Sequence, residues 1–285
     1  YLIVNGVECE PFLTADHSLM LSKGKEIITG TKIMMKALEV EKCNIGIENN
    51  KADAISHLSE LSKEEAGIEV QGLEVKYPQG GEKQLVAALL NREVPSGGLP
   101  IDVGVVAFNV GSIYAAYEAV QKNKPLIDRI VTVSGKKLEK PSNFRVRLGT
   151  PVIDVIESAG GLPNDAAKVV NGGPMMGKAL SDLASPVVKG TSGIVIFSEE
   201  DAHRREVLTC IRCTKCVSAC PMGLEPYLLQ AASERKLWER VEAERIMDCI
   251  ECGSCSYICP SNRPLLDYIR IGKAETAKRM RARKN

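Results

Sequence analysis

The 285-residue sequence predicts three successive modules: an α/β sheet domain, a small α+β module and an α-helical domain that binds metal clusters. Three observations predict this order. Over residues 1–125, short apolar runs alternate with helical patterns, which is typical of a parallel or mixed sheet covered by helices. Residues 126–199 are rich in β-type segments. Residues 200–272 contain eight of the ten cysteines, and a basic tail follows at 273–285.

The first module is expected to bind a ligand at one edge of its sheet, because such sheets place ligands at the carboxyl ends of their strands. The turns predicted at those ends carry Asn5-Gly6, Gly80-Gly81 and Asn109. Taken alone, Asn-Gly and Gly-Gly pairs are normally only turns. The expected strands cover residues 2–4, 43–47, 67–76 and 103–106, and expected helices cover 53–61, 82–90 and 112–120.

The second module combines β-type segments at 130–134, 144–148 and 193–197 with a short helix at 152–159. A Gly-Gly pair directly after this helix is a good C-terminal stop. The module also contains the stretch Gly172-Gly-Pro-Met-Met-Gly177, which has no Lys-Ser/Thr ending and therefore does not match a P-loop. Because glycine usually marks backbone geometry, we interpret this stretch as a tight structural turn.

The third module contains the pattern C-x-x-C-x-x-C-x-x-x-C-P twice. This is the ligand spacing of ferredoxins that hold two [4Fe–4S] clusters, in which the fourth cysteine of each run binds the other cluster. Zinc sites favour paired C-x-x-C knuckles, and disulfides favour oxidising compartments and short chains, so both alternatives are disfavoured. We expect Cys210, Cys213, Cys216 and Cys259 to hold one cluster, and Cys249, Cys252, Cys255 and Cys220 to hold the other.

Composition excludes several classes of function. The net charge of +1 gives no global field for binding nucleic acid. No apolar run approaches the roughly 18 residues of a membrane helix, and we expect no secretory signal. Cysteines used as cluster ligands indicate a reducing compartment, the cytoplasm. The chain opens at Tyr1 within a predicted strand, so we expect it to be part of a longer protein.

The segment between the cysteine runs, residues 225–247, has a helical composition, and another helix is expected after Pro264. The end of the chain is basic. A run of charge is most often a solvated face, and the functional alternative is contact with anionic lipid or an acidic partner. The basic side chains are Lys273, Lys278, Arg279, Arg281, Arg283 and Lys284.

Two segments of the first module, Asn5-Gly-Val-Glu-Cys-Glu-Pro11 and Tyr77-Pro-Gln-Gly-Gly-Glu-Lys-Gln-Leu85, resemble the flavin site of the NADH-binding subunit of respiratory complex I. The stretch Val106-Ala-Phe-Asn-Val110 shares this resemblance. Together with the Gly-Gly-Pro-Met-Met-Gly stretch and the two cysteine runs, the order of segments resembles the C-subunit family of the Rnf (Rsx) electron-transport complexes. This resemblance implies a flavin- and NADH-binding α/β domain, a β-grasp ligand-binding-like module and a dicluster ferredoxin domain.

The resemblance implies roles for particular residues. Asn5 and Glu8 would face the flavin, Glu10 would lie near the nicotinamide nucleotide, and Asn109 would contact the phosphate side of FMN. Gly80, Gly81 and Glu82 would line the isoalloxazine ring. The sequence departs from complex I at Val7, where an Asp is usual, and at Gly81, where a Glu is usual. The glycine-rich nucleotide loop that precedes the Asn-Gly segment in complex I is not in this chain.

The function implied is that of a peripheral subunit of a membrane-bound ferredoxin:NAD oxidoreductase complex. Such a subunit transfers electrons between NADH, FMN and two [4Fe–4S] clusters, on the cytoplasmic face of the bacterial inner membrane. Partner subunits, some embedded in the membrane, would couple this transfer to Na⁺ or H⁺ translocation. One alternative is a soluble flavin iron–sulfur reductase similar to the cobalamin reductases, and another is a non-enzymatic electron relay without flavin.

Overall fold

The computed structural model describes residues 1–284, and the side chains of residues 1–283. Asn285, the last residue of the predicted tail, and the side chain of Lys284 lie outside this description. The chain forms two compact units. The first comprises residues 1–94 and 98–203, and the second, here called the cysteine unit, comprises residues 95–97 and 204–284. Within the described residues, none of the helices is both long enough and apolar enough to cross a bilayer.

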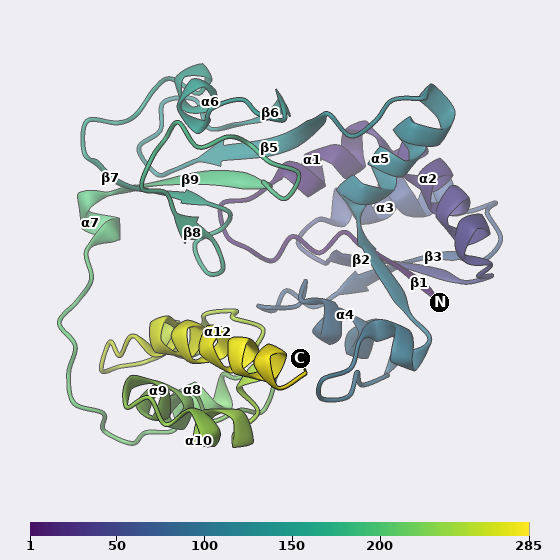
Figure 1. Cartoon of the computed structure of the whole chain (residues 1–285). Coiled ribbons are helices and arrows are strands. Elements are labelled where there is room, and N and C mark those ends of the chain that lie inside the picture. The colour runs from purple at the N-terminus through teal and green to yellow at the C-terminus, as the bar shows by residue number, and fades with distance from the viewer. Residues whose placement is uncertain (285) are drawn as a thin grey trace. The chain divides into compact units, whose positions relative to one another are not determined.

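The first unit opens with a four-stranded parallel sheet in the order β3-β2-β1-β4 (Figure 1). Its strands are β1 (Leu2–Asn5), β2 (Cys43–Glu48), β3 (Ile68–Leu73) and β4 (Val106–Asn109). Side chains alternate across β1: Leu2 and Val4 enter one apolar core, whereas Ile3 enters the other. The sheet is therefore buried on both faces, which explains why its strands are apolar runs rather than alternating patterns.

Helices cover both faces of this sheet. The first core packs against α1 (Ala15–Ser22), α2 (Gly24–Leu38), α3 (Ala52–Ser62) and α5 (Val110–Lys122), and the second core packs against α4 (Glu82–Leu90). In Figure 1, α4 lies on the opposite side of the sheet from α2, α3 and α5. Helix α4 approaches β2 closely over Gly46, where an added Cβ would lie 3.1 Å from a methyl carbon of Leu85.

The fourth strand is displaced from its expected position. The sequence predicts a strand at 103–106, but residues 100–103 form the 3-10 helix η1 (Pro100–Val103) and β4 begins at Val106. The Asp102 carboxylate accepts the backbone N–H of Leu99 at 2.8 Å, which stabilises the turn. Gly104 then adopts a left-handed conformation (φ 71°), so an extended strand begins only after it. The displacement puts Asn109 at the end of the strand.

The same unit continues into a five-stranded mixed sheet in the order β6-β5-β9-β7-β8. Strands β5 and β9 are parallel, and the other neighbouring pairs are antiparallel. A helix, α6 (Val152–Ser158), packs on the sheet core, and a short helix α7 (Glu199–Ala202) ends the unit. The strands are β5 (Asp128–Ser134), β6 (Ser142–Arg147), β7 (Ala166–Asn171), β8 (Lys178–Ala179) and β9 (Gly193–Ser198).

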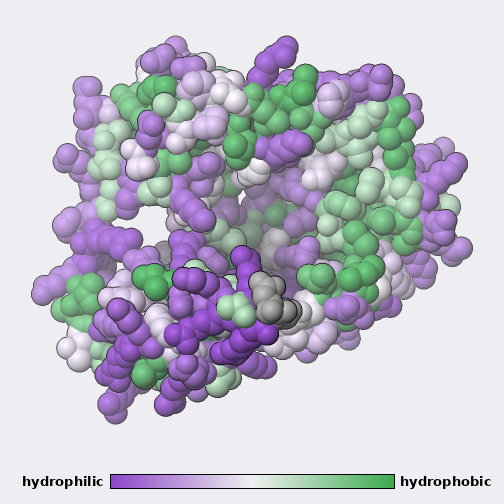
Figure 2. Space-filling view, in the orientation of Figure 1, coloured by the Kyte–Doolittle hydropathy of each residue, from purple (hydrophilic) through white to green (hydrophobic). Residues whose placement is uncertain are grey.

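The cysteine unit is helical. Helices α9 (Pro226–Glu234) and α10 (Trp238–Ala243) pack with α12 (Leu265–Lys284) around an apolar core that includes Leu229, Val241 and Ile269. Short elements α8 (Lys215–Ser218), η2 (Ile246–Asp248) and α11 (Ser254–Tyr257) complete the unit. The helical composition of residues 225–247 is thus divided among α9, α10 and η2. In the view of Figure 2, the exposed surface of α12 is largely hydrophilic.

Candidate functional site

The predicted ligand edge of the first sheet has two asparagines side by side. Asn5 and Asn109 are register partners at the carboxyl ends of the parallel strands β1 and β4. The Asn109 Oδ1 accepts the N–H of Gly111 at 2.8 Å and so caps α5, while its Nδ2 donates to Asp16 at 2.7 Å. Asn5 Nδ2 donates to the carbonyl of Gly80 at 2.9 Å. Both amides therefore hold the loops that form this edge.

Gly80 and Gly81 lie in a tight loop against the segment that follows β1. The Gly80 N–H donates to the Cys9 Sγ at 3.4 Å, and a Cβ at Gly80 would lie 2.6 Å from the carbonyl oxygen of Val7. Only glycine fits at this position without displacing that segment. Gly81 precedes α4, and Glu82 lies exposed in the first turn of the helix. The N-termini of α4 and α5 thus both contribute to the ligand edge, which suits an anionic group.

Glu8 is held at the start of α1. Its carboxylate accepts the backbone N–H groups of Asp16 at 3.0 Å and His17 at 3.2 Å. Burial and the nearby Asp16 charge raise the pKa of Glu8 to about 7, against the lowering effect of these hydrogen bonds and of Lys51. Burial also raises the pKa of Asp16, opposed by Asn109 and Arg129. The two carboxylates therefore titrate as a coupled pair, so the protonation of one changes the pKa of the other.

Glu10 points to a different partner, the glycine-rich loop of the second sheet. Its two carboxylate oxygens accept the N–H groups of Met175 at 3.0 Å and Met176 at 2.8 Å. Burial raises the pKa of Glu10, and these two hydrogen bonds lower it. The sequence alone predicts no more than a structural turn for this loop. Nothing in the local sequence signals a contact with a carboxylate more than 160 residues away.

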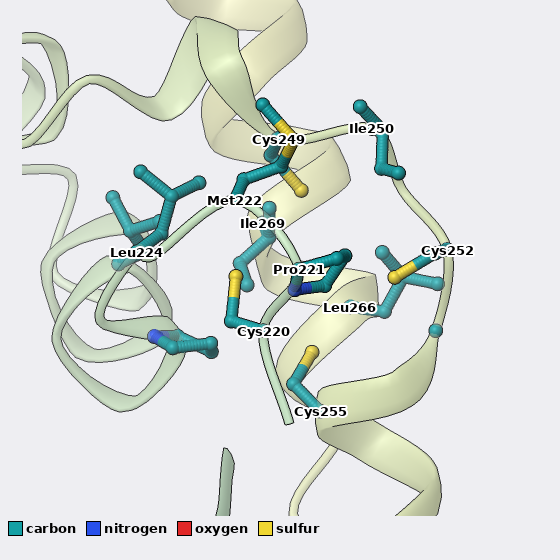
Figure 3. Close-up of a pocket in the computed structure, with 13 residues that line it drawn as sticks. Cys220, Pro221, Met222, Leu224, Cys249, Ile250, Cys252, Cys255, Leu266 and Ile269 are labelled. Carbon is teal, nitrogen blue, oxygen red and sulfur yellow. The ribbon is translucent and has the colours of Figure 1, made fainter. Parts of the chain in front are cut away.

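In the cysteine unit, Cys220 lies with Cys249, Cys252 and Cys255 around one pocket (Figure 3). The pocket walls are apolar and include Pro221, Met222, Leu224, Leu266 and Ile269. The Glu251 N–H donates to the Cys249 Sγ at 3.4 Å. Burial raises the pKa of the Cys255 thiol to about 12, so this thiol stays neutral until a metal displaces its proton. Four sulfur donors in an apolar pocket suit a [4Fe–4S] cluster.

The other expected set combines Cys210, Cys213 and Cys216 with Cys259. Cys210 and Cys213 are exposed, whereas Cys216 and Cys259 are half-buried. The Leu208 N–H donates to the Ser261 carbonyl at 3.0 Å, and the Ser261 hydroxyl donates to the Thr209 carbonyl at 3.0 Å. These contacts tie the segment before Cys210 to the segment after Cys259 and Pro260. They bring together the parts of the chain that the crossed assignment requires to share a cluster.

The two cysteine runs have matching backbone conformations. Arg212 and Glu251, each between the first and second cysteine of its run, are left-handed (φ 55° and 58°), and so are Thr214 and Gly253 (φ 58° and 81°). A short helix, α8 or α11, then follows in each run. Left-handed residues turn the backbone sharply, so three cysteines of a run can face the same point.

Cys43, His17 and His57 have structural surroundings. Cys43 is fully buried in β2, where burial raises the pKa of its thiol to about 12. Such a thiol is a small apolar side chain rather than a nucleophile. His17 pairs with Asp53 at 2.8 Å at the surface. His57 packs against Gly24, where its Nε2 would lie 2.6 Å from an added Cβ.

Three families match the chain in the order of these features. Residues 1–118 match the Nuo51 FMN-binding domain, residues 130–179 match the SLBB domain, and residues 202–274 match the 4Fe-4S dicluster domain. The chain thus combines a domain of a flavin-binding family with a domain of a family that holds two [4Fe–4S] clusters.

Two solved structures share the fold. The NAD⁺-reducing [NiFe]-hydrogenase matches with a TM-score of 0.61 in its H₂-reduced state, at 20% identity over 96% of this chain and 56% of that chain. In the air-oxidised state the TM-score is 0.64, at 17% identity over 97% of this chain and 59% of that chain. At such identities the likeness shows the fold alone.

Curated relatives are considerably more similar in sequence. The C subunit of the Na⁺-translocating ferredoxin:NAD⁺ oxidoreductase complex of Acetobacterium woodii is 45% identical over 96% of this chain and 62% of its own length. The C subunit of the proton-translocating complex of Clostridium ljungdahlii is 45% identical over 96% of this chain and 60% of its length. The C subunit of the ion-translocating oxidoreductase complex of Rhodobacter capsulatus is 39% identical over 98% and 54%. The chain thus spans 54–62% of the length of these relatives, and over that part it is similar to the C subunits of ion-translocating oxidoreductase complexes.

Proposed function

We propose that this chain is the electron-transfer part of a C subunit that exchanges electrons between NADH, bound FMN and two [4Fe–4S] clusters. The observation that carries the proposal is the presence, on one chain, of a flavin-domain edge and two cysteine sets, one of them gathered around an apolar pocket. NADH gives two electrons as a hydride, whereas a [4Fe–4S] cluster carries one. Bound FMN supplies the conversion between two-electron and one-electron chemistry.

The residues of the chain would bind and orient these groups. Asn5, Glu8 and Asn109, at the carboxyl ends of β1 and β4, would line the flavin together with Gly80, Gly81 and Glu82. Glu10, on the same segment as Glu8, would face the nicotinamide nucleotide. At neutral pH the Glu8 carboxyl is close to its pKa of about 7, so it would take up or release a proton near the flavin at little cost.

The cysteine unit would hold the clusters. Cys220 with Cys249, Cys252 and Cys255 would bind one cluster, and Cys210, Cys213 and Cys216 with Cys259 would bind the other. In this proposal the exposed second set exchanges electrons with an outside partner, because exposed Cys210 and Cys213 leave that cluster accessible. The chain would lie peripherally on the cytoplasmic face of the bacterial inner membrane. Membrane-embedded subunits would be those partners, and they would couple the transfer to Na⁺ or H⁺ movement.

The full-length protein, purified without oxygen, tests the proposal directly. We expect a flavin absorbance spectrum that bleaches on titration with NADH, accompanied by reduction of both clusters. A spectrum with clusters and no flavin would contradict it and favour a non-enzymatic relay. Full activity in a protein that never copurifies with membrane subunits would favour a soluble flavin iron–sulfur reductase instead.

A further inference from the structure

The loop between β7 and β8, residues 172–177, has a shape that depends on its glycines. Gly172 is left-handed (φ 104°) and donates its N–H to the Gly193 carbonyl at 2.7 Å. The Gly177 N–H donates to the Gly173 carbonyl at 2.9 Å and closes the loop. A Cβ at Gly177 would lie 2.4 Å from that carbonyl oxygen. Side chains at these positions would open the loop, so its shape is fixed by the sequence.

This closed loop leaves the N–H groups of Met175 and Met176 pointing at one carboxylate, that of Glu10. The approach is close enough to exclude a side chain at Gly173, where a Cβ would lie 2.3 Å from the Glu10 Oε2 and 2.4 Å from its Cδ. Hydrogen bonds from N–H groups to an ionised carboxylate are among the stronger ones in proteins. Glu10 is therefore fixed by the second sheet, although it belongs to the ligand edge of the first.

The residues after Glu10 fasten the same segment to the second sheet. The Phe12 carbonyl accepts the Ser134 hydroxyl at 2.8 Å, and the Phe12 ring packs edge-on against Phe197. The Thr14 N–H donates to the Thr132 hydroxyl at 3.0 Å. The segment is thus held on both sides of Glu10, since the Cys9 Sγ accepts the Gly80 N–H.

We propose that the loop 172–177 is a positioning element of the nucleotide site, and that it acts by holding the Glu10 carboxylate in one place for the incoming dinucleotide. This inference rests on the proposed function, in which Glu10 faces the nicotinamide nucleotide. It assigns a role to the second sheet: a loop of the SLBB domain completes a site whose other residues come from the flavin domain. Glu10 is the group that meets the substrate, whereas Gly173, Met175 and Met176 act through it.

The contact itself can be measured without any cofactor chemistry. In the full-length protein, hydrogen exchange at the Met175 and Met176 amides should be slow, and Glu10→Ala should accelerate it by about tenfold, the size expected for one lost hydrogen bond to a charged group. Gly173→Ala should have the same effect, because the added methyl displaces the carboxylate. Gly190→Ala is the matched control: Gly190 is in the same domain, with open space around its Cβ position.

Steady-state kinetics then test the consequence. Gly173→Ala should raise the KM for NADH by about tenfold, the size expected for the loss of one hydrogen bond to a charged group. It should change kcat little and leave the FMN and iron content unchanged. Glu10→Gln should do the same, and the double variant should be no worse than Glu10→Gln alone, since both changes remove one interaction. Should Gly173→Ala not fold, Glu10→Gln and Glu10→Ala carry both measurements.

The outcomes separate the two proposals. Unchanged amide exchange in Glu10→Ala would overturn the positioning contact whatever the protein does with NADH. Accelerated exchange with a wild-type KM in both Glu10→Gln and Gly173→Ala would also overturn it, because the contact would then be structural only. A wild-type protein without flavin or NADH oxidation would overturn the proposed function, while the exchange experiment would still report on the contact. Additive effects in the double variant would show that Gly173 acts independently of Glu10 and would overturn the positioning role.

Discussion

The Glu8 carboxylate accepts the backbone N–H of Asp16 at 3.0 Å, so a side chain expected at the flavin also caps the first helix of the fold. Helix α1 has no side-chain cap from Thr14, the residue directly before it. Its free N–H groups therefore depend on a carboxylate from the loop after β1. The protonation of Glu8 is consequently coupled both to the ligand edge and to the stability of the domain.

This coupling predicts a pH dependence that Glu8→Gln should remove. Burial and the Asp16 charge raise the pKa of Glu8 from 4.5 to about 7, so between these values the folded protein binds more protons than the unfolded chain. The contribution of Glu8 to the free energy of unfolding is then greatest below pH 4.5, and about 3 kcal/mol is lost as the pH rises through 7. Urea unfolding at pH 5 and at pH 8, monitored by hydrogen exchange of the β2 amides, measures this difference in the free energy of unfolding.

The control for this prediction is Glu60→Gln, a change to an exposed carboxylate whose pairing with Lys63 at 3.9 Å is loose. This variant should retain the pH dependence of the wild type, because surface pairs of this kind contribute little. If Glu8→Gln unfolds with the same pH dependence as the wild type, the raised pKa of Glu8 is not linked to folding.

Much of the architecture follows from local patterns in the sequence. The apolar runs at 2–4 and 43–47 predict buried strands, and this prediction is correct because β1 and β2 are covered on both faces. The spacing of the cysteines alone predicts the dicluster domain. The helix breaks do not follow from such patterns. Lys236 and Arg245 adopt left-handed conformations (φ 56° and 54°) that no glycine or proline announces, and they separate α9, α10 and η2. We attribute these two helix ends to packing against α12, which a short stretch of sequence cannot reveal.

The candidate site divides in the same way. Asn5 and Asn109 can be expected together because both follow parallel strands of one sheet. The partner of Glu10 cannot be predicted, because a carboxylate bound by backbone N–H groups depends on loop geometry and not on residue type. The signal present in the sequence is the set of three glycines in residues 172–177, which indicate an unusual backbone without revealing what it binds.

The crossed cluster ligands lead to a second prediction. Cys220→Ala should damage the cluster held by Cys249, Cys252 and Cys255, because the structure places Cys220 at their pocket although it lies in the other run. We expect the iron content to fall from about eight to about four per chain, according to the two-cluster ligand count. EPR spectra of the reduced protein identify which signal is lost. Cys259→Ala is the reciprocal variant and should remove the other signal. Loss of the same signal in both variants would show that the ligands are not crossed.

A third prediction concerns the joint between the two sheets of the first unit. Glu118 on α5 is buried and accepts hydrogen bonds from Tyr114 at 3.1 Å, Lys124 at 2.9 Å and Arg145 of β6 at 3.2 Å. Although burial disfavours its charge, the Lys124 and Tyr114 hydrogen bonds lower the pKa of Glu118. Glu118→Ala should therefore reduce the free energy of unfolding by about 2 kcal/mol, because it removes the acceptor that these three donors share, although Lys124 and Arg145 keep their contacts with Asp128.

Chemical denaturation of the Glu118→Ala and Glu60→Ala variants measures this effect. Glu60→Ala removes only the loose surface pair with Lys63 and should change stability by less than about 0.5 kcal/mol. The two values together show whether the loss comes from the joint or from removing a helical glutamate. Equal effects would mean that the Glu118 network does not hold the two sheets together.

The last prediction concerns the basic end of the chain, where the structure divides the charges into two groups. Arg279 pairs with Glu239 at 3.0 Å and with Glu275 at 3.2 Å, and Arg283 pairs with Glu242 at 2.8 Å, so these two arginines fasten α12 to α10. Lys278 and Arg281 lie on the same helix, and within residues 1–284 neither forms an ion pair. Of these four side chains, Lys278 and Arg281 are therefore the ones we expect to contact anionic lipid.

We therefore expect Lys278→Gln with Arg281→Gln to weaken the binding of the full-length protein to vesicles containing phosphatidylserine by about thirtyfold, at roughly 1 kcal/mol per basic residue near such a surface, without lowering the unfolding temperature. Arg279→Gln with Arg283→Gln is the matched pair: it removes the same charge from the same helix but should also lower the stability of the cysteine unit. Binding should fall for the wild type as salt rises, because the attraction is screened beyond about 8 Å at physiological ionic strength. Wild-type flotation of the Lys278/Arg281 variant at low salt would show that these side chains are a solvated face and that any membrane association is carried elsewhere.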